Sequence, residues 1–547
     1  MMTVAVTALF LLVFPLLVYG QDSFGQKVFW EKRQSVQQAV KKAFKDRIAE
    51  NDVDNSNGAR GHYFQQRVDH FGNQPGIAGS EWFKQYFLVL DTYYKPDGPV
   101  LLFLGGESAI TTKGLWGLPA QLAQEYGALL VNLEHRFYGA ENNRRSVPTS
   151  DTSPESLKLL TSRQAIEDAA YFITSFSSLY PEYNLTSQSK WISIGGSYAG
   201  ALSAWLREKH PELVYAAHAS SAPVLANQDF WRYSYSMEAG IDHFSGSKAC
   251  MNGWTNAMKA MDQTLKEYEG NDVQMFLFQQ KFGLPYKVNA PDIGNMVSFI
   301  LSSTVQYGPS YDYLIKPSFN QNGVTLMDGL CDGKHYPAFT NPSATSDELL
   351  ESLQRLTKMY YFPYSSLFRK NKWRRNRRDD TEENLHSSYF WAYQECNELG
   401  YQPTSQSLDN TEQMIRNYTA YSQFVKPEHW IAACGRNKFP ASVSTAINTN
   451  DYYGGLAINI SRILWVNGDV DPWHWLSKFD SPSSEQRSII FPGSTHCNDM
   501  WGTSTARDDQ LPKFYEIFGI YDEWLNITRR EPVSFKWKLR MKAKLKN

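Results

Sequence analysis

Residues 191–207 read Trp-Ile-Ser-Ile-Gly-Gly-Ser-Tyr-Ala-Gly-Ala-Leu-Ser-Ala-Trp-Leu-Arg, and this stretch decides the fold. Its first four residues form a short run typical of a buried strand, and the residues from Ala201 onward continue as a helix. Gly195 and Ala199 stand two residues before and two after Ser197, where small residues let a strand and a helix approach closely. The pattern predicts a nucleophile elbow, with Ser197 at the positive end of the helix. The alternative is a glycine- and serine-containing turn without a chemical role.

Apolar runs on both sides of this stretch predict further strands. They lie at residues 86–90, 100–104, 128–133, 463–466 and 488–491. The near-continuous hydrophobicity of several runs indicates strands that are buried on both faces, as in a mostly parallel sheet. Amphipathic stretches predict helices over residues 118–126, 163–179 and 509–528. Strands that alternate with helices in this way predict an α/β fold.

The 547 residues divide into regions of different character. Residues 1–20 contain an apolar run and predict a signal peptide, although no basic residue precedes the run; an N-terminal membrane anchor is the alternative. Residues 21–60 are polar and charged, which is typical of a propeptide or a flexible arm. We expect residues 61–225 and 441–547 to form the two parts of the α/β domain. Helical periods dominate residues 226–440, which we interpret as a helical insertion.

Composition limits the possible partners. The formal net charge is −2, without the basic surplus typical of nucleic-acid-binding proteins, so no nucleic-acid partner is predicted. No later stretch is long and apolar enough to span a bilayer, so we expect no stable membrane insertion. The basic run at residues 372–378 is interpreted as a solvated loop, with a processing site or a site for an anionic partner as alternatives.

Further sequence features agree with export. Glycosylation sequons are present at Asn184, Asn417, Asn459 and Asn526. The chain has five cysteines and no Cys-x-x-Cys pair, so neither a zinc site nor a thioredoxin-type motif is indicated. We predict no metal and no cofactor. An odd number of cysteines leaves at least one thiol unpaired in an oxidising compartment, unless it bridges two chains.

Two more loops contain candidate catalytic residues, and each directly follows a predicted late strand. The first contains Asp469 and Asp471, and from position alone either carboxylate qualifies to orient a catalytic histidine. The second contains His496; His474 is too close to Asp471 to come from a separate strand end, so His496 is the better general base. The order Ser, Asp, His along the chain is that of the α/β-hydrolase fold, which is the fold we predict.

An oxyanion hole is expected beside Ser197. One donor should be the backbone N–H of Tyr198, the residue after the nucleophile. The second should come from the glycine-containing loop that follows an early strand, where Gly106 and Glu107 are the candidates.

Longer motifs surround these residues. They include residues 195–207 with 220–223, Glu134–Gly139, Asp69–Phe71 and Asn467–Trp473. Together they resemble the prolyl carboxypeptidase and dipeptidyl peptidase II family of serine peptidases. Within this family, residues 104–107, 391–396, 452–455 and 471–474 are most similar to the thymus-specific serine protease branch. The resemblance extends from about residue 62 to residue 528 and is thin in the helical insertion.

The resemblance carries several implications. The orienting acid would be Asp471 rather than Asp469, and the helical insertion would be a cap over the active site. His135 belongs to a family motif but not to the triad, and we interpret it as structural. The family's cap disulfides transfer poorly to this sequence; Cys331 with Cys396 is the pair expected here, and Cys497 is the expected free thiol.

We therefore expect a secreted or lysosomal serine peptidase that acts on peptide substrates through Ser197, Asp471 and His496. The best-known family members cleave next to proline, where they release either a C-terminal residue or an N-terminal dipeptide. We therefore expect an exopeptidase rather than an endopeptidase. A homodimer is left open. One alternative is a carboxylesterase or lipase on the same fold. The other is a non-catalytic binding protein, which would require a broken triad.

Overall fold

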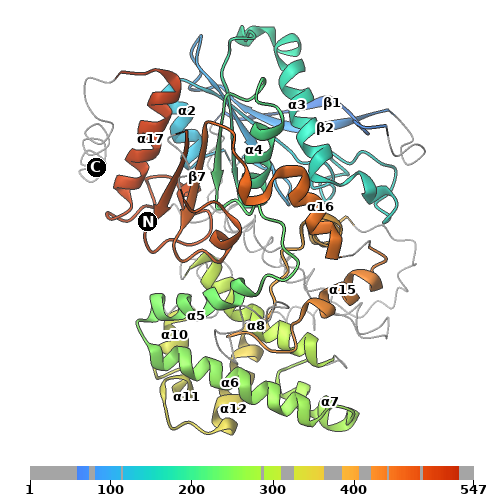
Figure 1. The fold of residues 1–547 in the computed structure, drawn as a ribbon, viewed down its shortest axis with the longest axis vertical. Coiled ribbons are helices and arrows are strands. Elements are labelled where there is room, and N and C mark those ends of the chain that lie inside the picture. Colours follow the sequence, from blue (N-terminus) through green and yellow to red (C-terminus); the bar gives the residue numbers. More distant parts are fainter. Residues whose placement is uncertain are drawn as a thin grey trace.

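An eight-stranded sheet lies at the centre of the computed structural model (Figure 1). The structure describes residues 58–72, 81–112, 115–284, 289–308, 326–361, 385–405, 420–439, 443–480 and 485–528. The predicted signal peptide, most of the predicted propeptide or arm, the basic run at 372–378 and Asn417 lie outside these residues. Predictions about them stay predictions.

The sheet is mostly parallel. Its strands are β1 (Arg60–Arg67), β2 (Trp82–Leu90), β3 (Val100–Leu104), β4 (Leu129–Leu133), β5 (Trp191–Gly196), β6 (Ala216–Ser220), β7 (Ile463–Gly468) and β8 (Gln486–Phe491). They lie side by side in the order β1-β2-β4-β3-β5-β6-β7-β8. β2 pairs antiparallel with β1 and with β4, and all other pairings are parallel. The parallel strands therefore end at one edge of the sheet, where the loops that carry Ser197, Asp471 and His496 meet.

Helices cover both faces of the sheet because its central strands are apolar on both sides. β3 and β4 are buried along their whole lengths, as expected for parallel strands between two helical layers. One face packs against α2 (Leu118–Tyr126) and α17 (Leu511–Leu525). The other packs against α3 (Ser162–Leu179) and α4 (Tyr198–Lys209). These helices confirm the predicted ones to within a few residues.

Two strands were not predicted. β1 extends the sheet at its edge, and it starts at Arg60, a residue that we had assigned to the propeptide or arm. β6 reads Ala-Ala-His-Ala-Ser and is fully buried between β5 and β7. Alanine has a low intrinsic strand preference, so the position of β6 in the sheet, and not its residue types, makes it a strand.

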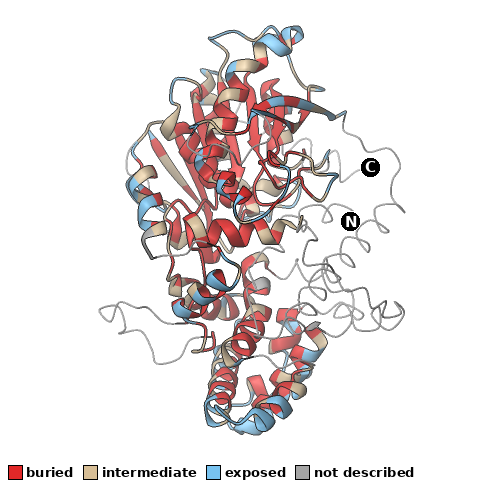
Figure 2. Cartoon of the chain, turned by 90° about the vertical axis from the view of Figure 1, so that its right-hand side faces the viewer, coloured by how far each residue is buried: buried red, intermediate tan, exposed pale blue. Residues whose placement is uncertain are grey.

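The described residues between β6 and β7 form helices. They are α5 (Trp231–Ser245), α6 (Lys248–Glu267), α7 (Asp272–Lys281), α8 (Ala290–Tyr307), α10 (Leu326–Cys331), α11 (Pro337–Thr340), α12 (Ser346–Tyr361), α14 (Ser387–Gln394), the π-helix η7 (Glu395–Leu399), α15 (Pro427–Arg436) and α16 (Val443–Tyr453). The helices α5–α12 form a body at one end of the molecule, whereas α16 lies nearer the sheet (Figure 1). Buried residues fill the interior of this body as well as the sheet (Figure 2). The region boundaries at residues 225 and 440 stay a prediction.

The strand order, the flanking helices and the strand-to-helix turn at Ser197 make this an α/β-hydrolase fold with a helical insertion after β6. The fold class predicted from the sequence is confirmed.

Candidate active site

Ser197 lies in the turn between β5 and α4. Its backbone adopts φ 59° and ψ −133°, a conformation that costs a non-glycine residue on the order of 1–3 kcal/mol. The N–H of Ser197 donates to the carbonyl oxygen of Ser220 at 2.9 Å and so holds the turn. A Cβ on Gly195 would lie 2.0 Å from the carbonyl oxygen of Ala199, so no larger residue fits there. The close approach of strand and helix expected from the sequence is present.

The structure brings Ser197, His496 and Asp471 together from three loops. His496 Nε2 lies 2.8 Å from Ser197 Oγ. His496 Nδ1 lies 3.0 Å and 2.9 Å from the two carboxylate oxygens of Asp471. The main-chain N–H of His496 donates to the carbonyl oxygen of Gln306 on α8, at 2.9 Å. The helical insertion therefore helps to hold the histidine.

The environment of His496 favours its protonated form. The side chains of His496 and Asp471 are both fully buried. Burial by itself lowers the pKa of His496. The charges and hydrogen bonds of Asp471 and Cys497 together outweigh burial and raise the pKa well above the usual value for histidine. The pair is therefore suited to stabilise an imidazolium that forms when His496 accepts a proton from Ser197.

The two candidate acids have different surroundings. Asp471 also accepts the N–H of Trp473 at 2.9 Å, which fixes its carboxylate at the start of a short helical turn. Asp469 is exposed and accepts the N–H of Ser494 at 3.2 Å. His474 lies with Nδ1 2.6 Å from the carbonyl oxygen of Asp471, so its hydrogen bond is to the main chain of that loop. Of these two carboxylates, Asp471 is the one that contacts His496 in the folded protein, although their positions in the sequence alone do not distinguish them.

The expected oxyanion donors lie close to one another. Tyr198 is the first residue of α4, so its N–H is among those without a partner inside the helix. Gly106 lies in the loop after β3, and a Cβ on this residue would be 3.6 Å from the main-chain nitrogen of Ala199. The loop with Gly106 and Glu107 therefore passes beside the first turn of α4, next to Ser197.

Comparison with known proteins decides the family. The serine carboxypeptidase S28 family matches residues 66–514. The chain belongs to this family. It is thus a serine peptidase, as the motifs of the sequence predicted.

Relatives of the S28 chain match over most of its length. A putative serine protease of Caenorhabditis elegans is 31% identical over 487 residues, covering 85% of this chain and 88% of that protein. The thymus-specific serine protease of Homo sapiens is 28% identical over 485 residues, covering 86% and 88%. The lysosomal Pro-X carboxypeptidase of Bos taurus is 26% identical over 468 residues, covering 83% and 86%. The resemblance predicted from the motifs is confirmed.

Ser220 and Ser221, at the end of β6, hold the loops of the S28 site that carry Ser197 and His496. The sequence analysis did not assign them this role. Ser220 accepts the N–H of Ser197 through its carbonyl oxygen, and its hydroxyl donates to the buried carboxylate of Asp499. Ser221 accepts the N–H of Cys497 at 2.8 Å. The signal was present in the Ser220–Pro223 motif, which we used only for the resemblance.

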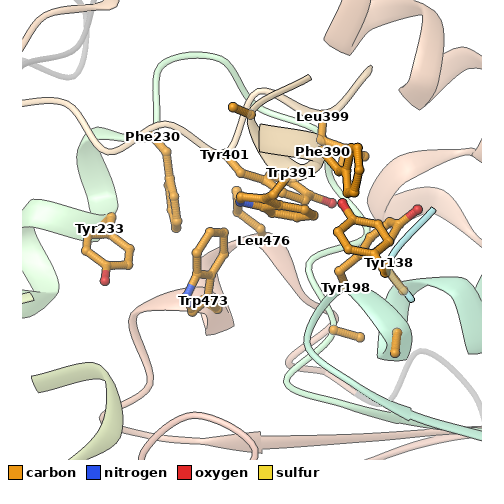
Figure 3. Packing of buried hydrophobic residues seen from close by; sticks show 14 of the residues in the cluster. Tyr138, Tyr198, Phe230, Tyr233, Phe390, Trp391, Leu399, Tyr401, Trp473 and Leu476 are labelled. Carbon is orange, nitrogen blue, oxygen red and sulfur yellow. The ribbon is translucent and has the colours of Figure 1, made fainter. Parts of the chain in front are cut away.

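Aromatic side chains from the hydrolase domain and the insertion pack together beside the site (Figure 3). Trp473 follows Asp471 on the acid loop, and its ring centroid lies 6.0 Å from that of His496. It also contacts Phe230 at 5.3 Å and Tyr401 at 5.5 Å between ring centroids. The insertion therefore supplies part of an apolar wall next to the triad.

The predicted disulfide between Cys331 and Cys396 is wrong. Cys331 pairs with Cys250, with 5.3 Å between their Cα atoms, and Cys396 pairs with Cys434, with 5.8 Å. Cys331 ends α10, which packs with α5 and α11, whereas Cys396 lies in η7, which packs with α14 and α16. The two residues thus belong to separate groups of helices. Cys497 is the free cysteine, as predicted, and it is buried.

The structure also bears on the predicted glycosylation sites, membrane helices and metal sites. Asn184, Asn459 and Asn526 are exposed, so all three are accessible to a glycosyltransferase. Within the described residues, no helix is long and apolar enough to cross a membrane. The same residues contain no group of three or more His, Cys, Asp or Glu side chains arranged to hold a metal ion.

Glu107 has an unusual environment for a carboxyl group. It is only 7% exposed. Burial raises the pKa of Glu107 to about 7, although its own main-chain N–H and the charge of His496 act in the opposite direction. The folded protein therefore keeps a proton on Glu107 at pH values where the unfolded chain has lost it.

This environment predicts that part of the stability declines as the pH rises. A raised pKa stabilises the fold fully below about pH 4.5, and this contribution is lost as the pH rises through about 7. Glu107→Gln cannot ionise, so it is expected to remove roughly 3 kcal/mol of that pH dependence, at about 1.4 kcal/mol per pKa unit. Urea denaturation at pH 5 and pH 8 measures it. Glu81→Gln, at an exposed position, is the control. An equally steep decline in Glu107→Gln would contradict the assignment.

Proposed function

We propose that this S28 peptidase is an exported exopeptidase that uses Ser197, His496 and Asp471 as its catalytic triad. The observation that carries the proposal is the continuous hydrogen-bonded series from Ser197 Oγ through His496 to Asp471, with contacts of 2.8 Å and 2.9 Å. All three side chains stand on loops at the same edge of the sheet, which is where α/β-hydrolases carry out acyl transfer.

The proposed reaction proceeds through an acyl-enzyme. Ser197 Oγ attacks the carbonyl carbon of the scissile peptide bond while His496 Nε2 accepts the hydroxyl proton. Asp471 holds His496 in the tautomer with a proton on Nδ1 and stabilises the imidazolium. His496 then transfers its proton to the leaving amine, and a water molecule, activated by the same histidine, releases the acyl group.

The oxyanion of the tetrahedral intermediate needs preorganised donors. We assign one to the N–H of Tyr198 and the other to the loop at Gly106 and Glu107. This assignment is supported by the position of Gly106 against the first turn of α4. The amino terminus of α4 adds a favourable partial charge next to the same oxygen.

Proline-containing peptides are the proposed substrates. One relative is named a lysosomal Pro-X carboxypeptidase, and the ring centroid of Trp473 lies 6.0 Å from that of His496. A pyrrolidine ring is compact and apolar, so it packs well against an aromatic face. Carboxypeptidase and dipeptidyl-peptidase modes both remain compatible with the apolar wall around Trp473.

The covalent features of the chain favour export. The two disulfides need an oxidising environment in which to form. The predicted signal peptide and the exposed sequons agree with passage through such an environment. We therefore propose a secreted or lysosomal protein.

A panel of short peptides tests the proposed function. Proline is placed at successive positions, each peptide is made with free or blocked ends, and hydrolysis is followed by mass spectrometry at pH 5 and pH 7. The expected result is cleavage next to proline that is lost when one particular terminus is blocked. A simple ester is assayed in parallel. Turnover of the ester without cleavage of any peptide would instead support a carboxylesterase, and cleavage with both ends blocked would contradict the exopeptidase assignment.

A further inference from the structure

Tyr198, the residue after the nucleophile, has a buried side chain with several contacts. Its side chain is 1% exposed and lies where the helical insertion meets the hydrolase domain. Its hydroxyl accepts a hydrogen bond from Gln394 Nε2 at 2.8 Å and lies 3.1 Å from His135 Nε2. Its ring packs against Trp391, with 5.4 Å between centroids. Three motifs that are distant in sequence therefore meet at one tyrosine side chain. Figure 3 shows Tyr198 with Trp391 beside it.

The donor and the acceptor of each hydrogen bond around Tyr198 can be assigned. His135 Nδ1 lies 2.8 Å from the carbonyl oxygen of Arg136, so Nδ1 carries the proton and donates. Burial lowers the pKa of His135 to about 4, so the ring is neutral and its Nε2 accepts. The Tyr198 hydroxyl thus donates to His135 and accepts from Gln394. The hydroxyl of Tyr138 in turn donates to Gln394 Oε1 at 2.6 Å.

Gln394 links the helical insertion to the hydrolase domain. It is the last residue of α14, and the π-helix η7 follows it at once. Within η7, the carboxylate of Glu398 accepts hydrogen bonds from the N–H and the hydroxyl of Ser162 at the start of α3. Cys396 in the same turn is bonded to Cys434. Glu398 therefore holds this segment of the insertion to the hydrolase domain, four residues after Gln394.

We propose that Gln394 is a positioning residue through which the helical insertion sets the oxyanion donor at Tyr198. The inference rests on the proposed function, in which the Tyr198 N–H binds the oxyanion. Gln394 touches neither Ser197 nor His496 in any hydrogen bond of the described residues, so it acts through the Tyr198 side chain. Because that ring is clamped by Gln394 and His135, the first turn of α4 is held in one orientation.

This role explains two motifs that the triad does not use. Glu134–Gly139 supplies His135 and Tyr138, and residues 391–396 supply Trp391 and Gln394. An amide is required at position 394 because it must donate to one hydroxyl and accept from another. A carboxylate of the same size accepts only, so it would compete with His135 for the Tyr198 proton.

The test compares wild type with Gln394→Met. This variant keeps the side-chain size but removes the hydrogen bonds of Gln394 with Tyr198 and Tyr138 and its longer one to Glu398, at 3.4 Å. Loss of a complete oxyanion donor lowers kcat by about a hundredfold to a thousandfold, so misplacing one is expected to cost about tenfold to a hundredfold. KM for the peptide is expected to change little, because ground-state contacts remain. The rate at which a fluorophosphonate labels Ser197 should fall in parallel. Gln402→Met, at a second buried glutamine of the insertion, is the matched control and should leave both rates unchanged.

A double-mutant cycle shows whether Gln394 acts through Tyr198. Tyr198→Phe is expected to lower kcat by a similar factor, and Gln394→Met combined with Tyr198→Phe should lose little more than either change alone. Additive losses, or a kcat in Gln394→Met equal to that of wild type, would overturn the inference. If Gln394→Met does not fold in a thermal melt, an unchanged kcat in Tyr198→Phe overturns it instead. Absence of any labelling in wild type would refute the proposed function itself.

Discussion

Ser197→Ala is expected to abolish peptide hydrolysis while leaving the protein folded. Removing the nucleophile of a serine peptidase lowers kcat by about a millionfold, and the remaining oxyanion donors do not compensate. The methyl group of alanine occupies the same space as the serine Cβ, so the turn between β5 and α4 keeps its neighbours. Hydrolysis of the best peptide of the panel and covalent labelling by a fluorophosphonate measure the loss.

Ser197→Gly is an informative companion because of the backbone at this position. The φ of 59° and ψ of −133° are unfavourable for any residue with a Cβ, but not for glycine. We expect Ser197→Gly to be as inactive as Ser197→Ala and to melt at a higher temperature than Ser197→Ala. Labelling of either variant at the wild-type site would contradict the assignment of Ser197. A lower melting temperature for the glycine variant would contradict strain at the turn.

Asp471→Asn is expected to lower kcat by about ten-thousandfold, the loss found when a triad aspartate becomes an amide. The amide oxygen can still accept the N–H of Trp473, so the loop keeps its shape. The amide NH2 then faces His496 Nδ1 and forces the histidine proton onto Nε2, which points at Ser197. A protonated Nε2 cannot accept the proton of the serine hydroxyl.

Asp469→Asn is the matched control for this prediction. Asp469 stands two residues earlier on the same loop, is exposed, and uses its side chain to accept the N–H of Ser494. An asparagine retains that acceptor, so kcat is expected to stay within about twofold, as for a surface substitution away from the site. The two variants are compared by steady-state kinetics on one peptide. Equal losses in both would remove the distinction between the acids, and a larger loss in Asp469→Asn would reverse it.

The parts of the site that could be predicted depend on local patterns. Gly195, Ser197 and the apolar strand before them lie next to one another in the sequence, so their geometry follows from chain stereochemistry alone. His496 could be chosen because it directly follows a late apolar strand in the expected chain order. β1 and β6 were missed because their pairing partners, and not their own residues, make them strands.

The disulfides and the surroundings of Tyr198 depend on contacts between distant segments. Cys250 and Cys331 are separated by 81 residues, and no local rule selects one partner among five cysteines. Gln394 meets Tyr198 across 196 residues. Such pairings follow from how the helices of the insertion pack, which a periodic pattern does not specify.

By itself, the amino-acid sequence determined the α/β-hydrolase fold, the nucleophile turn and the chemical class, because strand periodicity and the elbow are local and the motifs are long. The motif resemblance already favoured Asp471 over Asp469 as the partner of His496. The tertiary structure alone decided which cysteines pair and how the insertion reaches Tyr198. The physical reason is that hydrogen bonds and disulfides depend on distances of a few ångströms. Only the packed chain sets these distances between residues that are far apart in sequence.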